Sequence, residues 1–159
     1  MKNLFLKLSL AGSIFLGLQT AHAQTPYKTA LGLGIDFGDG ETLVGPQIKH
    51  NFNGPHAGNA QVLFGNHITV VGVDYSYNSP ISGANGLGWY AGVGPQVAFV
   101  DHGNHDKTYF GIRPAVGLEY RIPSTPLGMH FDWKPWWNLS NNTNFEAGRF
   151  SFGLKFVLK

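Results

Sequence analysis

The sequence predicts an all-β fold, an antiparallel up-and-down barrel of eight strands, and three observations lead to this prediction. Bulky apolar residues alternate with small or polar residues along most of the chain, which is the period of a β-strand. Eight such segments follow one another, and short turns rich in Gly, Pro, Asn and Asp separate them. Of the 159 residues, 22 are Gly and only 13% are charged, which is about half the charged fraction usual in soluble domains.

The first four segments are delimited by their turns. In the first segment Leu31, Leu33 and Ile35 share one face, while Gly32 and Gly34 share the other. The turns after it read Gly-Asp-Gly-Glu, Asn-Gly-Pro-His and Gly-Asn-His, and residues of these types favour tight connections. We therefore expect strands over residues 27–37, 42–52, 57–64 and 68–77.

The last four segments show the alternation most clearly. Trp89 and Val93 in the fifth segment, and Phe110 and Leu118 in the sixth, stand opposite Gly, Ala and charged residues. The seventh segment sets Met, Phe and Trp against His and Asp, and the eighth sets Phe and Leu against Arg, Ser, Gly and Lys. We expect these strands over residues 87–100, 108–122, 129–137 and 146–158.

The connections fix the order of the strands. All are short, polar or rich in Gly and Pro, and they cover residues 38–41, 53–56, 65–67, 78–86, 101–107, 123–128 and 138–145. Because a parallel crossover needs a dozen or more residues, successive strands must be antiparallel neighbours. Such a meander of eight strands closes naturally into a barrel, which removes the exposed edges.

The size of the side chains decides which face of the barrel lies outside. The bulky face cannot fit inside eight strands, whereas the face with Gly, Ala and charges fills the lumen well. The sequence therefore predicts a transmembrane barrel with its apolar face toward lipid. Aromatic residues near strand ends are typical of interfacial girdles, and they are Tyr27, Tyr75, Tyr77, Trp89, Tyr120, Trp133 and Trp137. Prolines lack a ladder donor, so we expect bulges at Pro46, Pro95, Pro114 and Pro135.

Residues 1–23 have the pattern of a cleaved secretory signal peptide, which leaves residues 24–159 as the barrel domain. Lys2 and Lys7 accompany an apolar run too short to span a membrane, and Ala21-His22-Ala23 forms a cleavage site. Two of the eleven basic residues leave with this leader, so nine basic and nine acidic residues remain. This balance gives no basis for nucleic-acid binding. The absence of Cys excludes disulfides and thiolate metal sites.

With these features the chain resembles the small eight-stranded outer-membrane barrels of Gram-negative bacteria, the porin-like OmpA/OmpX-type group. The resemblance covers residues 24–159 and rests on the leader, the eight alternating strands and the aromatic last strand. It implies an outer-membrane location, a monomer surrounded by lipid and lipopolysaccharide, and insertion by the barrel assembly machinery. It also implies that an assembly signal lies on the apolar face of the last strand, at Phe150, Phe152, Leu154, Phe156 and Leu158. The chain ends in Leu158-Lys159, where the family pattern ends in an aromatic residue.

The charges expected in the lumen suggest what it does. They are Lys28, Asp36, Lys49, Asp74, Arg113, Glu119, Arg121, Asp132, Lys134, Arg149 and Lys155. Two carboxylates and four cations on neighbouring strands form the predicted lumen charge network, namely Glu119, Asp132, Arg113, Arg121, Lys134 and Arg149. Because buried charges persist when they are paired, we expect these carboxylates to pair with these cations and close the lumen.

The favoured function is that of a non-enzymatic integral outer-membrane protein with a structural or interaction role. A narrow small-solute channel is the alternative, followed by a lipid-modifying enzyme, and a soluble periplasmic barrel is the alternative location. Acyl transfer needs Ser, His and an acid at one rim, but His130 stands near Asp132 on the inward face and Ser140 stands in a loop without His. His102 and His105 could approach a metal, yet a solvated turn is favoured, and we predict no cofactor and no metal. Both termini should be periplasmic, so that the connections at 38–41, 65–67, 101–107 and 138–145 face outside.

Overall fold

The computed structural model describes residues 27–101, 106–140 and 143–158. The predicted leader, His102, His105 and Lys159 lie outside the described residues. The strands of the described part are β1 (Thr29–Gly38), β2 (Leu43–Asn51), β3 (His56–Phe64), β4 (Ile68–Pro80), β5 (Leu87–Val100), β6 (Lys107–Arg121), β7 (Leu127–Trp133), β8 (Trp136–Asn138), β9 (Asn144–Glu146) and β10 (Arg149–Leu158). No helix in residues 27–101, 106–140 and 143–158 is long and apolar enough to cross a membrane.

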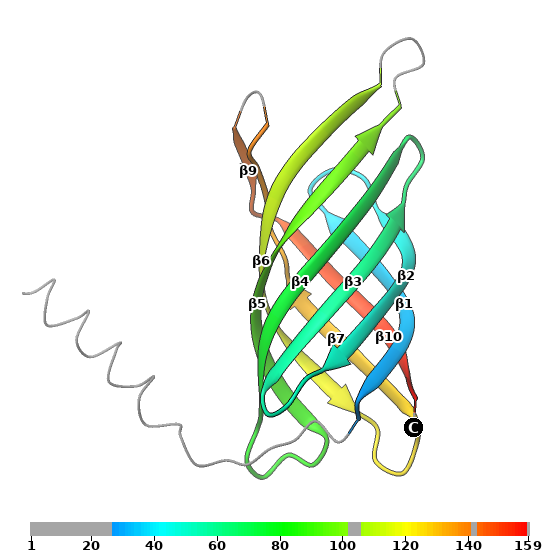
Figure 1. The fold of residues 1–159 in the computed structure, drawn as a ribbon, viewed down its shortest axis with the longest axis vertical. Helices are drawn as coiled ribbons and strands as arrows, with labels where there is room; N and C mark the ends of the chain where they lie inside the picture. The colour runs from blue at the N-terminus through cyan, green and yellow to red at the C-terminus, as the bar shows by residue number, and fades with distance from the viewer. Residues whose placement is uncertain (1–26, 102–105, 141–142, 159) are drawn as a thin grey trace, which may run out of the picture.

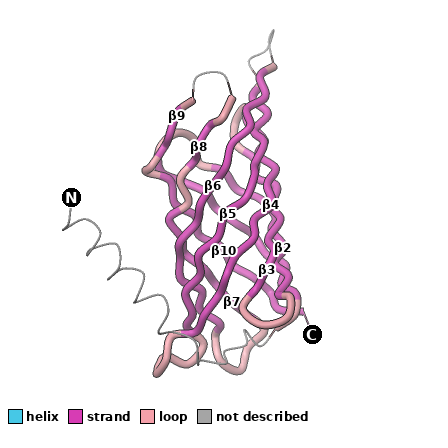
Figure 2. Tube along the Cα trace, turned by 60° about the vertical axis from the view of Figure 1, so that its left-hand side comes forward, coloured by secondary structure: helices cyan, strands magenta, loops and turns pink. Residues whose placement is uncertain are grey.

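The strands form one closed antiparallel barrel, as Figures 1 and 2 show. Each strand from β1 to β6 pairs with the next one along the chain. The barrel closes where β10 pairs with β7 on one side and with β1 on the other, from Thr29↔Leu158 to Gly38↔Arg149. The short strand β8 continues the β7 wall and β9 leads into β10, so the wall has eight strands. The predicted fold class is confirmed.

The strand boundaries follow the turn chemistry closely. The fifth strand covers the predicted residues 87–100, and the third runs from His56 to Phe64. The seventh predicted strand is divided in two, because Lys134 and Pro135 lie between β7 and β8. The eighth is divided as well, because Ala147 and Gly148 lie between β9 and β10.

The prolines lie where the strand ladders are interrupted. The β2–β3 ladder pairs Val44 with Phe64 and Gln47 with Gln61, and it skips Pro46 without inserting a residue. The β4–β5 ladder skips Pro95 in the same way. The expected bulges are therefore wrong at these two positions, since a gap in an unchanged register suffices.

A bulge does lie beside Pro135. Trp136 pairs with Glu146, and the backbone N–H of Lys134 donates to the Arg149 carbonyl. Two residues, Ala147 and Gly148, therefore stand opposite the one residue Pro135, which is the arrangement of a β-bulge. Proline has no N–H to donate, so the strand segment that contains Pro135 loses no ladder donor at this bulge.

The two faces of the wall are sorted as the side-chain sizes predict. Leu33, Val116 and Leu154 are 61%, 55% and 55% exposed on the outside, whereas Ala30 and Asp36 are fully buried. The apolar face of β10 points outward, with Leu154, Phe156 and Leu158 exposed and Phe150 and Phe152 half-buried.

One aromatic residue was assigned to the wrong face. Tyr27 is buried, and its hydroxyl donates to Glu119 Oε1 at 2.5 Å, so it does not belong to a lipid-facing girdle. Tyr27 precedes β1, where the period-2 pattern no longer determines the direction of a side chain. The other predicted girdle residues, Tyr75, Tyr77, Trp89, Tyr120, Trp133 and Trp137, are exposed or half-buried.

Candidate functional site

The lumen of the barrel holds the buried charged side chains of the part of the chain that the structure describes. Nine charged side chains are buried in this part of the chain, five of them cations and four carboxylates: Lys49, Arg113, Lys134, Arg149, Lys155, Asp36, Asp74, Glu119 and Asp132. They come from six of the eight wall strands and from the break after β7. A cluster of this size in a low-dielectric interior is stable only if its members are paired and hydrogen-bonded.

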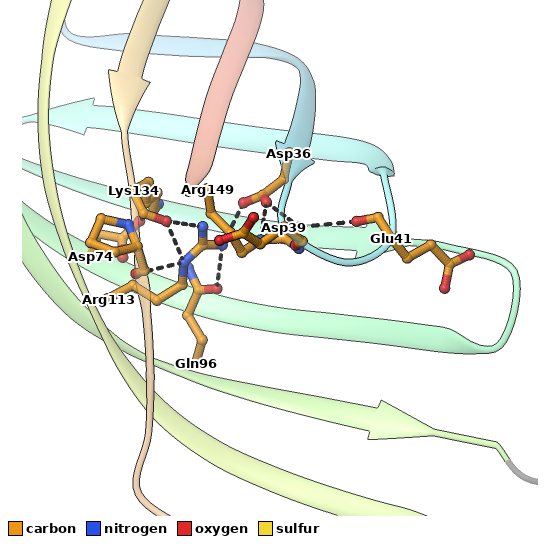
Figure 3. A network of polar contacts seen from close by, with 9 residues as sticks. Asp36, Asp39, Glu41, Asp74, Gln96, Arg113, Lys134 and Arg149 are labelled. Atoms are coloured by element: carbon orange, nitrogen blue, oxygen red, sulfur yellow. Dashed lines mark hydrogen bonds and ion pairs between the residues drawn. The ribbon is translucent and has the colours of Figure 1, made fainter. Parts of the chain in front are cut away.

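One carboxylate, Asp36 on β1, holds two arginines. Arg149 Nε donates to Asp36 Oδ1 at 2.8 Å, and Arg113 pairs with Asp36 Oδ2 from the opposite wall. Figure 3 shows both guanidinium groups converging on this side chain. Arg149 Nη2 also donates to the Glu41 carbonyl at 3.1 Å, whereas the Glu41 carboxylate points away from the arginines.

The break between β7 and β8 contributes directly to this cluster. Arg113 Nε donates to the backbone carbonyls of Lys134 and Pro135 at 3.1 and 3.3 Å. These carbonyls can turn into the lumen because they belong to no regular strand ladder. The ammonium group of Lys134 pairs with Asp74 on β4, so the interrupted strand supplies both acceptors and a cation to the lumen.

A second cluster lies toward the end of the barrel that holds Tyr27 and Leu158, which we call the terminal end. Glu119 Oε2 is 2.5 Å from Lys49 Nζ and 3.6 Å from Lys155 Nζ. Lys49 Nζ also donates to Asn78 Oδ1 at 2.7 Å. Burial, and then the charge of Glu119, raise the pKa of the Tyr27 hydroxyl, so Tyr27 stays a hydrogen-bond donor to that carboxylate.

Between the two clusters lies a small central cavity. Its volume is about 20 Å³, and Gln61, Asp74, His130 and Asp132 are among the residues that line it. That volume holds little more than one water molecule. Within the described residues, each of these four side chains has one buried polar atom without a hydrogen-bond partner. The hydroxyl of Tyr90 donates to the other oxygen of Asp132.

The structure places the six residues of the predicted lumen charge network as follows. Arg113, Glu119, Asp132, Lys134 and Arg149 are buried in the lumen, and Arg121 is half-buried at the end of β6. Lys28, which was also expected to point inward, is exposed just before β1.

The expected pairing within this network is wrong. Glu119 pairs with Lys49 and Lys155, and the partners of the buried arginines and Lys134 are Asp36 and Asp74. The strand order brings carboxylates and cations together on adjacent strands, but side chains in a narrow lumen also reach across it. The inward positions of these partners follow from the alternation, while the roles of Tyr90 and Gln96 have no signal beyond their place in it. The role of Tyr27 has no signal in the sequence, because the alternation places that residue on the outer face.

The lumen becomes apolar toward its other end, which carries the β1–β2, β3–β4, β5–β6 and β8–β9 connections and which we call the far end. Leu43, Leu63, Val70 and Ala98 form a buried cluster there, and Ile68, Tyr109 and Trp136 pack against it. A pocket of about 340 Å³ lies beside this cluster. The sequence placed Tyr109 and Trp136 on the inward face but did not reveal that several strands bring apolar residues to the same level.

Comparison with solved structures identifies the architecture. A de novo designed transmembrane β-barrel matches with a TM-score of 0.60 and 13% sequence identity over 85% of this chain and 98% of the design. The N-terminal β-barrel domain of Pseudomonas aeruginosa OprF matches with a TM-score of 0.59 and 13% identity over 83% and 99% of the two chains. Neisserial surface protein A gives a TM-score of 0.49 and 13% identity over 82% and 94%.

No protein-family model and no curated protein matches the sequence. The first two structural matches show that the fold is that of a small eight-stranded transmembrane barrel of the outer-membrane type.

Proposed function

We propose that the protein is an integral β-barrel of the outer membrane with a closed lumen and a structural or interaction role. The observation that carries the proposal is the lumen itself, in which paired charges from opposite walls leave a central cavity of about 20 Å³. A hydrated ion or a small solute needs a continuous wider path, so this lumen does not conduct steadily.

The outer surface supports a membrane location. Large apolar side chains are exposed on every side of the barrel, including Leu33, Val73, Val116, Phe131 and Leu154. A soluble monomer rarely exposes contiguous apolar patches larger than a few hundred Å², whereas lipid-facing strands require them. Lipid and lipopolysaccharide would surround the monomer, after export through the leader and insertion by the assembly machinery that reads β10.

The described residues also favour a non-enzymatic role. Ser140 lies beyond β8, where its hydroxyl accepts from the Phe110 backbone N–H at 2.7 Å, whereas His130 is buried in the lumen. A nucleophilic hydroxyl needs a base within hydrogen-bond reach at a surface that substrate can approach. This Ser and this His do not form such a pair.

Planar-bilayer recordings test the closed lumen. We expect no sustained ohmic conductance from purified wild-type protein, with a general porin as the positive control. The double variant Asp74→Ala/Lys134→Ala removes a complete ion pair and should show conductance above the wild-type level. Steady conductance of the wild type, with swelling of protein-containing liposomes in small sugars, would establish the small-solute channel instead.

Fractionation tests the location. The protein should be recovered with outer membranes, and its folded form should migrate differently from the boiled form on a gel. Recovery in the soluble fraction without detergent would favour the soluble periplasmic barrel.

A further inference from the structure

The far end of the lumen has an apolar lining, which the closure of the lumen by ion pairs does not require. The pocket of about 340 Å³ is walled by Leu43, Ile68, Val70, Ala98, Tyr109 and Trp136. The interior of a transmembrane barrel is ordinarily polar. A mostly apolar, concave lining with a few charged groups is instead the usual make-up of a small-molecule site, and this volume lies at the lower end of the usual range.

The deepest charged groups of the pocket are poorly suited to bind an anion. Arg113 and Arg149 contribute to the lining but are only 1% and 6% exposed. Arg113 already donates to Asp36, Gln96 and the carbonyls after β7, and Arg149 donates to Asp36 and the carbonyls of the β1–β2 connection. An anion would have to displace these bonds.

The rim of the pocket has the opposite charge. Glu41 is exposed and Glu146 is half-buried, and both line the pocket. Of the charged residues described in the far-end connections and at the strand ends beside them, five are acidic and two are basic, namely Asp39, Glu41, Asp101, Asp106, Glu146, Lys107 and Arg149. Arg149 is buried, so five acidic residues and one basic residue remain at the rim itself. A rim of one sign concentrates ligands of the other sign. The aromatic rings of Tyr109 and Trp136 offer faces that attract cations.

We propose that this pocket binds a small amphipathic organic cation, with its apolar body against Tyr109 and Trp136 and its positive charge toward Glu146 and Glu41. The buried arginines below orient the ligand, because they repel the charged end and keep it at the rim. The ligand is bound above the closed section of the lumen and does not pass through it, so the site is separate from the proposed closure.

Calorimetric titration of the full chain in phosphatidylcholine nanodiscs tests the proposal with three probes of nearly equal shape. These are 2-phenylethylammonium, neutral 2-phenylethanol and anionic 3-phenylpropanoate, each corrected for uptake by empty nanodiscs. We expect the cation to bind about fivefold more tightly than the alcohol, and the anion to bind most weakly.

Three variants locate the site. Glu146→Gln should weaken binding of the cation about three- to fivefold and leave the alcohol unchanged. Ala98→Phe should fill the pocket and abolish binding of all three probes. The control Asp106→Asn removes the same charge from the far end, but Asp106 does not line the pocket. The affinity of this variant for the cation should therefore stay within about twofold of the wild-type affinity.

Two results would overturn the proposal. One is binding of the cation to the protein that is no stronger than its uptake by empty nanodiscs. The apolar lining would then only shield the ion pairs from water. The other is preference for the anion, or a loss in Asp106→Asn equal to that in Glu146→Gln. Heat-modifiability of each variant verifies folding, and Glu146→Gln keeps the test decisive if Ala98→Phe does not fold. Conductance of the wild type would refute the closed lumen without affecting these affinities.

Discussion

Asp36 is the residue on which the ion-pair cluster nearer the far end depends. It is fully buried and is the shared carboxylate of Arg113 and Arg149. Removing one partner of a buried pair leaves uncompensated charge and costs about 3–5 kcal/mol. We therefore expect Asp36→Asn to lower the free energy of unfolding by about that amount, measured by urea titration in phospholipid vesicles.

The control for this prediction is the exposed Asp106. Asp106→Asn should change the free energy of unfolding by no more than about 0.5 kcal/mol. Equal stability of Asp36→Asn and wild type would mean that the two arginines find other partners or that water enters the cluster.

At the residue scale, the sequence predicts which face a charged side chain points to better than it predicts which residue that side chain pairs with. Alternation alone places Asp36, Lys49, Asp74 and Lys155 on the inward face, and all four are buried there. Their partners depend on how far the strands are staggered around the barrel, and a single sequence does not encode that stagger in any local pattern. For this reason Glu119 was assigned to cations on neighbouring strands, although it binds Lys49 and Lys155.

At the element scale, the seam between β1 and β10 closes the barrel, and its glycines differ in what surrounds them. A Cβ on Gly32 would collide with the backbone carbonyl of Leu154 across the seam. A Cβ on Gly34, two residues along the same strand, would meet only the Gln47 side chain at 3.5 Å, which is ordinary contact. The two positions therefore form a matched pair on one strand.

We expect Gly32→Ala to destabilise the barrel by about 1–3 kcal/mol, because the two strand backbones must separate. Gly34→Ala should be neutral or stabilising by up to about 1 kcal/mol, since Ala restricts the unfolded chain. Refolding yield into vesicles and urea midpoints of the two variants measure this difference. Similar midpoints would show that the β1–β10 seam is looser than its register implies.

The elements were predictable as far as period and turn residues define them. The alternation places all eight wall strands, yet it runs unbroken through Lys134 and Pro135, where the structure ends β7 and starts β8. Pro135 is the sequence signal for this break, but the main effect of the break lies on another strand. The carbonyls that it frees from the ladder bind Arg113 on the neighbouring wall strand, and that contact exists only once the barrel has closed.

At the scale of the whole molecule, the charges described at the two ends differ in sign. Acidic residues dominate at the far end, whereas Lys28 and Arg121 lie at the terminal end and the acidic Glu119 near it is neutralised inside the lumen. The apolar pocket also opens at the far end. The fold class followed from composition and period, but this asymmetry became visible only when the connections were assigned to ends.

A membrane-embedded barrel should tolerate charge on its outer surface according to depth rather than exposure. Leu33 lies in the middle of β1 and is 61% exposed, whereas Phe52 lies just beyond the end of β2 and is 55% exposed. A soluble barrel would treat Leu33→Arg and Phe52→Arg alike. In a bilayer an arginine at the midplane costs about 2–4 kcal/mol, and one near the interface costs at most about 1 kcal/mol. We therefore expect Leu33→Arg to lower the free energy of unfolding in phosphatidylcholine vesicles by at least about 1 kcal/mol more than Phe52→Arg. Equal losses would contradict a lipid-facing outer surface.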